Sequence, residues 1–435
     1  MMKVSRFASV GLAITALLAL LWIIGGNAYA RYRERQVERA WVQSFGPLQK
    51  LLDRYPTTTR NETARRLERL AEPLGLDLAP KTEEMSSADA RAVSRPDQKE
   101  SEEEWQAVSR YLTSQLEKPE AGVDRPPKEV ERFFAAHGSD LRALATELAT
   151  SPAPRWDFDP SILPSHQPIP SLRALIRLQR ALLAGGLIDP AGKNLGAPGQ
   201  TLEASWRLNQ ALSEMSQLTS QLIAVAVARM QVGALRKMEV DASLWRAWLA
   251  EHDFKRSVLD TELLALWPDP KRYRRLEEID SRSKKNVGMR MQALFLHPWQ
   301  DIVWAEVTEK MRLAFLRIKD APLSDERIPE RKGAASAAEI LLSIQMPNLL
   351  ESFRRVDRLV LDAELTGKIL QARQLRLQNG SEEWPAAVPG IESSRFPGAK
   401  WIYSISPDGT MSLSLSKEPH WDSSGLVLPN RFKSS

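Results

Sequence analysis

Residues 7–35 read FASVGLAITALLALLWIIGGNAYARYRER, and this stretch decides where the rest of the chain folds. From Phe7 to Ile24 the segment is apolar except for one serine, one threonine and one glycine. A helix rises about 1.5 Å per residue, so a helix that continues to Ala30 can cross a hydrocarbon core of ~30 Å. Residues 1–30 are therefore predicted to be a transmembrane anchor or a signal.

These two interpretations differ in whether the segment stays in the protein. Lys3 and Arg6 precede it, as basic residues do in both signals and anchors. Ala28-Tyr29-Ala30 has the small-x-small form of a signal-peptidase site, which favours cleavage. The apolar core of a secretory signal usually has only about 7–15 residues, so the length here favours a retained anchor.

Basic residues flank the segment on both sides, and the positive-inside rule therefore does not choose an orientation. They are Lys3 and Arg6 before it, and Arg31, Arg33, Arg35 and Arg39 after it. The short N-terminal tail and the signal-like opening favour a tail in the cytoplasm. We therefore expect a single-pass protein of the bacterial inner membrane with its body in the periplasm.

The composition limits the partners and the chemistry of the chain. Its 435 residues are 26% charged and 43% hydrophobic, enough to bury a large core. The net charge of +5 is too small to require nucleic acid, so no nucleic acid is expected as a partner. The sequence has 0 cysteines, which excludes disulfides, thiolate metal sites and cysteine nucleophiles.

We expect a mainly α fold in successive segments after the anchor. Residues 31–79 are predicted to form membrane-proximal helices, 80–104 a flexible linker, 105–333 a helical body, and 334–435 a long helix with a β-hairpin tail. The linker, PKTEEMSSADARAVSRPDQKESEEE, has too few large apolar residues to offset the entropy lost on ordering.

Capping and breaking residues define the helices of the body. A helix from Glu129 is expected to break at Gly138, with Ser139 capping the next one, and a helix over 172–183 is expected to end at Gly185-Gly186. Other predicted caps are Asn61, Asp241 and Asp253.

The spacing of apolar residues predicts further elements of the body. A pattern from Thr201 to Met238 has one apolar face, which a polar cluster at 213–220 can divide into two helices. Further helices are predicted at 242–252, 254–267 and 299–318. Six prolines between 152 and 170 predict an extended segment. Successive helices joined by short turns suggest a stack of helical hairpins.

The strongest local pattern is WIYSISPDGTMSLSLS, residues 401–416. Pro-Asp-Gly suits a three-residue turn, and hydrophobic alternation then pairs Ile405 with Met411, Tyr403 with Leu413, and Trp401 with Leu415. An isolated hairpin is marginally stable, so its apolar face requires support. The long helix predicted after Pro347 supplies this support, and its Gly367 is expected to admit a close neighbour.

This long helix, the following LQNGSEEWPAAVPG and the short sheet resemble the globular heads of type IV pilins and pseudopilins. The resemblance covers about the last 85 residues. The N-terminus departs from that family, because it lacks the Gly-Phe junction and the following glutamate that processing and assembly require. The whole chain also resembles large membrane-anchored bacterial proteins with such a tail, which implies no activity.

No catalytic, cofactor-binding or metal-binding residue is predicted, and no cofactor is expected. The histidines have no metal-ligand spacing; they are His137, His166, His252, His297 and His420. Asp157, Asp159 and His166 share the Pro-rich segment, where a small metal site is the alternative to a turn pattern.

Two further clusters have a structural and a functional interpretation. Residues 271–285 carry several basic side chains around Tyr273 that could bind nucleic acid or lipid headgroups, but interspersed acids favour a solvated helix. Four tryptophans in helical segments are predicted to pack in cores rather than to line a ligand groove; they are Trp245, Trp248, Trp299 and Trp304.

The sequence thus favours an envelope-anchored scaffold or assembly protein that binds other envelope proteins. One alternative is an enzyme that acts on cell-wall or surface polymer. Another is an accessory component of a pilin-like secretion system, in which loss of residues 335–435 abolishes partner capture while the body still folds.

Overall fold

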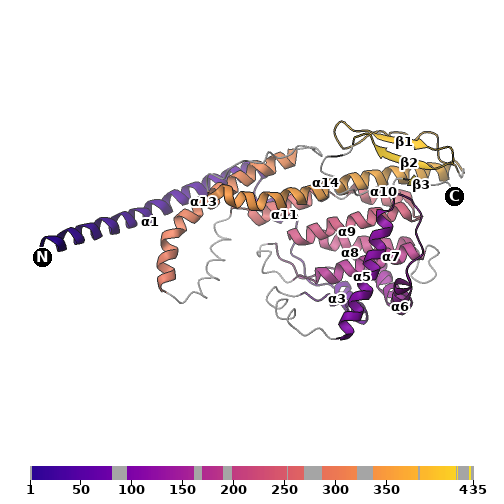
Figure 1. The fold of residues 1–435 in the computed structure, drawn as a ribbon, viewed down its shortest axis with the longest axis horizontal. Coiled ribbons are helices and arrows are strands. Elements are labelled where there is room, and N and C mark those ends of the chain that lie inside the picture. The colour runs from indigo at the N-terminus through magenta and orange to yellow at the C-terminus, as the bar shows by residue number, and fades with distance from the viewer. Residues whose placement is uncertain are drawn as a thin grey trace. The chain divides into compact units, whose positions relative to one another are not determined.

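The protein is mainly helical, with a small three-stranded antiparallel sheet near its C-terminus (Figure 1). The computed structural model describes residues 2–80, 96–160, 169–189, 198–251, 253–268, 287–320, 337–380, 383–417, 419 and 431–432. The chain forms two compact units. Unit 1 comprises Met1–Arg54, Glu262–Ala321 and Ile328–Leu350, and unit 2 contains the remaining residues. Both units combine distant stretches, unlike the successive segments expected from the sequence.

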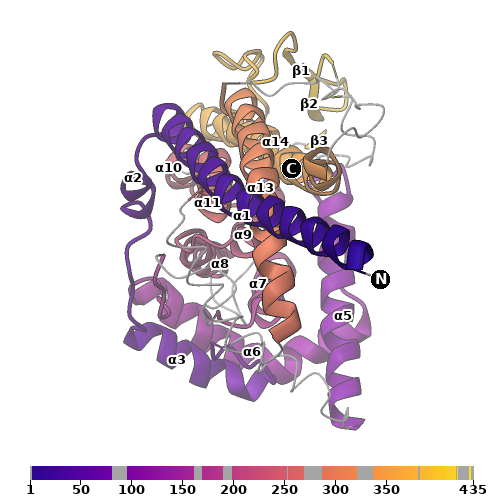
Figure 2. The same cartoon turned by 90° about the vertical axis from the view of Figure 1, so that its left-hand side faces the viewer.

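Unit 1 is built around two long helices that contact each other, α1 (Met2–Phe45) and α13 (Val287–Asp320), and Figure 2 shows them crossing. Gly26 of α1 adjoins Pro298, because a Cβ atom on Gly26 would lie 2.9 Å from Pro298 Cβ. Further along, Arg312 Nη1 of α13 donates to Ser44 Oγ at 2.7 Å. The two helices therefore progress in the same direction along their contact.

The buried residues of α1 form one narrow stripe that faces α13. They are spaced by four or seven residues, as in a coiled-coil seam, and comprise Gly26, Ala30, Val37 and Trp41. Trp41 is 0% exposed and meets Phe315 and Trp267 edge-on, at centroid distances of 6.0 and 5.5 Å. Its Nε1 donates to Thr308 O at 3.3 Å. This aromatic contact fixes the register of the pair.

The start of α13 corrects the prediction of a helix over 299–318. The helix begins at Val287 and contains Pro298. A proline inside a helix removes one backbone hydrogen bond and kinks the helix without always ending it. Figure 1 shows the bend and the N-terminal limb of α13 turning away from α1. The buried proline ring packs where Gly26 leaves room for it.

Unit 2 contains a stack of helices that follow one another in the chain. They are α3 (Glu62–Ala71), α5 (Pro96–Glu117), α6 (Lys128–Thr150), α7 (Leu172–Ile188), α8 (Pro198–Ser213), α9 (Leu218–Lys237) and α10 (Ala242–Glu251). From α5 to α9, each helix contacts the next helix and the next but one. The cluster at 213–220 does divide the pattern, because α8 and α9 are separate helices. A short helix α2 (Leu48–Leu52) belongs to unit 1, and η1 (Glu72–Leu74) follows α3.

Three predicted caps are confirmed by hydrogen bonds. Asn61 Oδ1 accepts from Ala64 N at 2.9 Å at the start of α3. Asp241 Oδ1 accepts from Ser243 N at 2.9 Å before α10. Asp253 Oδ1 accepts from Arg256 N at 3.0 Å before α11 (Phe254–Leu266). Each carboxylate or amide oxygen satisfies a donor that the first helical turn leaves without an intrahelical partner.

The glycines predicted to break helices do not break them. α6 runs through Gly138, which is buried, and Ser139 lies inside the helix rather than at a cap. α7 continues through Gly185-Gly186 to Ile188. A Cβ on Gly186 would lie 2.5 Å from Thr201 Oγ1 and 2.6 Å from Met238 Cε. Gly186 therefore permits close helix packing instead of ending a helix.

The predicted linker over 80–104 is wrong from residue 96 onward, because α5 begins at Pro96. Proline is well suited to the first turn of a helix. Glu102 also forms ion pairs with Arg173, at 2.8 Å, and with Arg177 on α7. Tertiary contacts thus hold in a helix a segment whose composition alone predicts a flexible linker. Residues 81–95 lie outside the described residues.

The long helix α14 (Ala337–Gln378) lies within the segment 334–435 predicted to hold a long helix, and it begins ten residues before Pro347. Its apolar stripe is buried as expected at Leu349, Phe353 and Val356. The expectation for Gly367 is wrong, because a Cβ there would meet nothing within 4 Å.

The C-terminal sheet has the predicted register. β1 (Trp401–Ile405) pairs with β2 (Met411–Leu415) with Trp401 opposite Leu415, Tyr403 opposite Leu413, and Ile405 opposite Met411. Gly409 has φ +78° in the turn, which favours glycine. A third strand, β3 (Arg431–Phe432), pairs with β2 and was not predicted.

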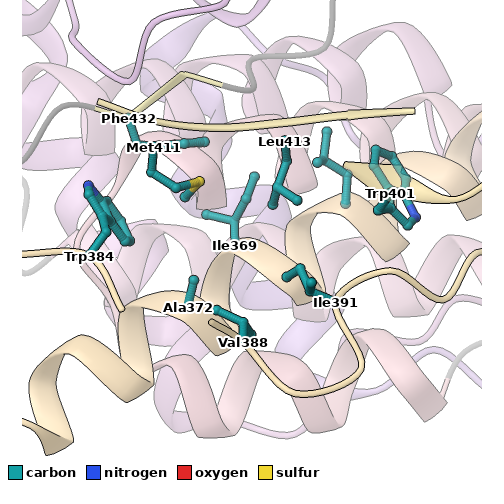
Figure 3. Packing of buried hydrophobic residues seen from close by; sticks show 10 residues of the cluster. Ile369, Ala372, Trp384, Val388, Ile391, Trp401, Met411, Leu413 and Phe432 are labelled. Atoms are coloured by element: carbon teal, nitrogen blue, oxygen red, sulfur yellow. The ribbon is translucent and has the colours of Figure 1, made fainter. Parts of the chain in front are cut away.

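Helix α14 supports the apolar face of this sheet, as predicted. Figure 3 shows Ile369 of α14 pointing towards Met411 and Leu413. Leu365, Ile369 and Ala372 join the sheet and the connecting loop in one core cluster; the other members are Trp384, Val388, Ile391, Trp401, Met411, Leu413 and Phe432. The helix and the sheet therefore form two layers that share one hydrophobic core.

Two of the helical glycines of unit 2, Gly186 and Gly367, provide a matched pair of variants. Gly186→Ala should lower the free energy of unfolding by about 1–3 kcal/mol, because the new methyl group overpacks the contact with Thr201. Gly367→Ala should raise it by roughly 0.5–1 kcal/mol, because alanine loses less backbone entropy in an open helical position. Urea unfolding of the full-length protein in mild detergent measures both. Equal effects of the same sign would contradict the packing role of Gly186.

Candidate functional site

The exposed apolar surface of the described residues is concentrated on α1. Most of the large hydrophobic side chains that are at least 39% exposed belong to it: Ile14, Leu17, Leu18, Leu20, Leu21, Trp22, Ile24, Tyr29, Tyr32 and Val42. The side chains of residues 2–13, 15 and 16 lie outside the description. An exposed apolar surface of this size on a folded protein marks an interaction with protein or membrane.

This apolar surface extends around most of the helix before the contact with α13 begins. Leu20, Leu21 and Trp22 are consecutive and are 54%, 58% and 42% exposed. Consecutive residues of a helix are about 100° apart, so these three already cover more than half of its circumference. From Gly26 onward, only one stripe is buried and the other faces are largely polar. The exposed surface of the helix thus changes from apolar to largely polar near residue 26.

Aromatic and basic side chains follow one another at this transition. Trp22, Tyr29 and Tyr32 are 42%, 52% and 57% exposed. They span ten residues, or about 15 Å along the helix. The arginines that follow the apolar run begin at Arg31. This order, apolar residues followed by exposed aromatic residues and then by arginines, is typical of the point where a helix leaves a bilayer.

One helix of the described residues meets the length and hydropathy requirements of a membrane span. It is α9 (Leu218–Lys237), and 61% of its apolar window is buried inside unit 2. Ala224, Val227 and Ala228 are 0% exposed. This burial is that of a core helix.

Where the structure describes them, residues considered for metal or catalytic chemistry make other contacts. His137 packs on Phe133 with centroids 5.0 Å apart, and His297 Nδ1 lies 2.9 Å from Asp301 Oδ2. Asp157 Oδ1 accepts from Arg60 N at 2.9 Å. In the described part of the chain, no three histidines or carboxylates are close enough to hold a metal ion. His166, His252, His420 and the basic cluster at 271–285 lie outside the described residues.

Two hollows in unit 2 are small. One encloses about 230 Å³ open to solvent and is lined by Thr58, Pro154, Arg155, Trp156, Phe158, Ala211, Glu214 and Met215. The other encloses about 170 Å³ and is lined by Trp206, Asn209, Gln210, Ser213 and Phe254. Ligand pockets usually have roughly 300–1,000 Å³. Each hollow has only about 10 Å³ that a water-sized molecule can reach, far below that range.

Burial displaces the pKa of several ionisable side chains, among them Glu262, Asp357 and Lys237. It raises the pKa of Glu262 in unit 1 to about 7. In unit 2, burial raises the pKa of Asp357 to about 6, against the opposing effect of Lys255. It lowers the pKa of Lys237 to about 8. None of these three side chains lines either of the two hollows. Neither hollow therefore contains one of these side chains with a displaced pKa.

A buried ionic contact joins α9 to α14 within unit 2. Arg236 Nη1 lies 3.2 Å from Asp362 Oδ1 and donates to Thr366 Oγ1 at 2.8 Å. Burial lowers the pKa of Arg236, and Asp362 opposes that effect. Arg373 Nη1 donates to Met238 O at 2.9 Å, beside further carbonyl contacts at the end of α9. These contacts position α14, and with it the sheet, on the helical stack.

The predicted core role of the tryptophans holds for some and fails for one. Trp245 is 2% exposed and packs with Trp206 and Trp248, at 5.8 and 4.8 Å between ring centroids. Trp304 is partly buried. Trp299 is 47% exposed, which contradicts the prediction that it packs in a core. Helical periodicity alone gave no sign of this, because the face of α13 that is covered depends on α1.

Comparison of the chain with protein-family models, with curated proteins and with solved structures found no match.

The buried carboxyl of Glu262 predicts a pH-dependent stability. In the unfolded chain this carboxyl ionises near its usual pKa of 4.5, whereas in the folded protein it stays neutral until about pH 7. The contribution of the neutral buried carboxyl to the free energy of unfolding is therefore complete below about pH 4.5. It is lost as the pH rises through about 7. Between these two pH values the free energy of unfolding should fall by roughly 3 kcal/mol.

The measurement is the free energy of unfolding of the full-length protein at several pH values. Wild-type stability should fall more steeply with rising pH than that of Glu262→Gln, which cannot ionise. The exposed Glu103→Gln should retain the wild-type slope. Identical slopes for wild type and Glu262→Gln would contradict the burial of an uncompensated carboxyl.

Proposed function

We propose that this protein is a scaffold or assembly factor of the bacterial envelope, held in the inner membrane by α1 with its body in the periplasm. The observation that carries the proposal is the surface of α1. Large apolar side chains are exposed around most of the helix at residues 14, 17, 18, 20, 21, 22 and 24. In water this surface costs about 25 cal/mol per Å² of exposed apolar area, whereas a bilayer core removes the cost.

Retention of the anchor has support from the position of the small-x-small sequence. Ala28, Tyr29 and Ala30 lie inside the unbroken helix α1, and Ala30 is 1% exposed. A protease that cuts after Ala30 requires access to a backbone that is here helical and packed on α13. A retained anchor therefore agrees better with the structure than a signal cleaved to leave Arg31 at the N-terminus.

The partner-binding part of the proposal has support at the C-terminal sheet. β1 is at the edge of the described sheet, and its Ile402 and Ile405 are 50% and 39% exposed. An edge strand presents backbone donors and acceptors that a strand of another chain can use. The exposed isoleucines would supply side-chain contacts to an envelope protein.

A second candidate function is an accessory role in a pilin-like secretion system. The observation that favours it is the packing of α14 against an antiparallel sheet in one core cluster. Deletion of residues 335–435 is unsuitable as a test, because it would remove α14 together with its contacts to Arg236 and expose the face of α9 on which it packs. Substitutions on the exposed face of β1 test this role without that damage.

Membrane fractionation tests the anchor. Full-length protein should stay in the membrane after alkaline carbonate extraction, and protease should digest its body in spheroplasts with an intact inner membrane. A variant with Leu18→Arg and Leu21→Arg should become extractable, because each arginine costs about 2.5–3.5 kcal/mol in the centre of a membrane helix. A variant with Leu313→Arg, exposed on α13, should remain in the membrane. Extraction of the wild type would refute the anchor.

Photo-crosslinking in cells tests partner binding. A photoreactive phenylalanine analogue in place of Ile402 should trap a defined envelope protein, and the additional change Ile405→Glu should reduce that product several-fold. The same analogue in place of Leu244, 42% exposed on α10, serves as the control. If neither site traps a protein, or both trap the same mixture, the sheet is not the binding surface. A pilin-like component as the trapped protein would favour the second candidate.

A further inference from the structure

The exposed tryptophan of α13 lies at the same level as the point where α1 ceases to be apolar. Pro298 adjoins Gly26, which follows Ile24 by two residues, or about 3 Å along the helix. Trp299 is the next residue of α13 and is 47% exposed. On the other side of the proline, Leu296 is 42% exposed. Two apolar side chains of α13 thus flank the level at which α1 would leave the hydrocarbon.

The limb of α13 that precedes Pro298 turns away from α1 at this same level. Figure 1 shows the bend, and Figure 2 shows the limb continuing beyond the crossing with α1. The limb, residues 287–296, has the sequence VGMRMQALFL, with one charged residue, Arg290. Because it leaves the axis of α1 instead of following it, the limb is placed to run beside the bilayer surface rather than through the bilayer.

We propose that this limb and Trp299 form a second membrane contact, at the boundary between headgroups and acyl chains around the exit point of α1. The inference rests on the proposed anchoring by α1. An apolar helical segment that ends in tryptophan suits this boundary, where such helices lie roughly 5–10 Å deep. Trp22 and Tyr29 of α1, both exposed, lie within a few residues of Gly26 and complete an aromatic belt with Trp299.

A bilayer fits this surface better than water or a soluble partner for two reasons. First, the surface is continuous with the apolar part of α1 through the contact between Gly26 and Pro298. Second, Arg31 and Arg33 follow on α1 and are placed to meet anionic headgroups. Two contacts at one level would also fix the tilt and rotation of unit 1, which a single helix leaves free.

Because the chain has 0 cysteines, single-cysteine labelling can test this contact in the full-length protein. Four variants, Leu18→Cys, Leu296→Cys, Trp299→Cys and Leu313→Cys, each carry an environment-sensitive fluorophore. They are reconstituted in vesicles of phosphatidylethanolamine and phosphatidylglycerol that contain lipids with a nitroxide near the headgroup or near the chain end. All four positions are at least 42% exposed, so they accept the label. Leu313 is the matched control, because it lies on α13 about 21 Å beyond Trp299.

The expected result is a loss of about half or more of the emission at positions 296 and 299 with the shallow nitroxide, since both would lie within ~10 Å of the headgroup boundary. Position 18 should respond mainly to the deep nitroxide, and position 313 to neither. Quenching at 18 without quenching at 296 and 299 would overturn the second contact and leave the anchor intact. Quenching at 313 as strongly as at 299 would also overturn it. No quenching at 18 would overturn the anchor itself, and the second contact with it.

Discussion

The constraint on which the structure depends is that one continuous helix, α1, has two different surfaces. Its first half exposes leucine, isoleucine and tryptophan around most of its circumference, and its second half buries a single stripe against α13. The change occurs at Gly26, where the absence of a side chain admits Pro298. The proposed lipid environment for the first half would satisfy its apolar surface, and the helix partner α13 covers the buried stripe of the second half. Neither requires a break in the backbone.

In unit 2, burial of charge determines how the helical stack and the sheet are joined. Arg236 and Asp362 lie deep between α9 and α14, and burial lowers the pKa of Arg373 to about 10. Arg373 donates to carbonyls at the C-terminus of α9, where the helix dipole favours a cation. These polar contacts fix the position of α14, and α14 in turn carries the apolar core of the sheet. A partner-binding surface on β1 would therefore be held rigidly on the body.

Local features were predictable and long-range features were not. The hairpin register followed from Pro-Asp-Gly and strict alternation, because a turn and a period of two leave one pairing that buries Trp401 and Leu413. Caps such as Asn61 followed from hydrogen bonding within one helical turn. The effect of Gly186 was missed, since a glycine that ends a helix and a glycine that admits a neighbour are identical in sequence.

The sequence by itself determined the apolar character and length of the first segment, the helical nature of the body and the pairing of the hairpin. Each of these depends on residues close together in the chain. Only the tertiary structure decided that residues 287–320 join residues 1–54 in one unit, and that α5 begins at Pro96. It also decided that Trp299 is exposed rather than buried. Exposure and pairing depend on which distant helix covers a given face, and local periodicity does not encode that choice.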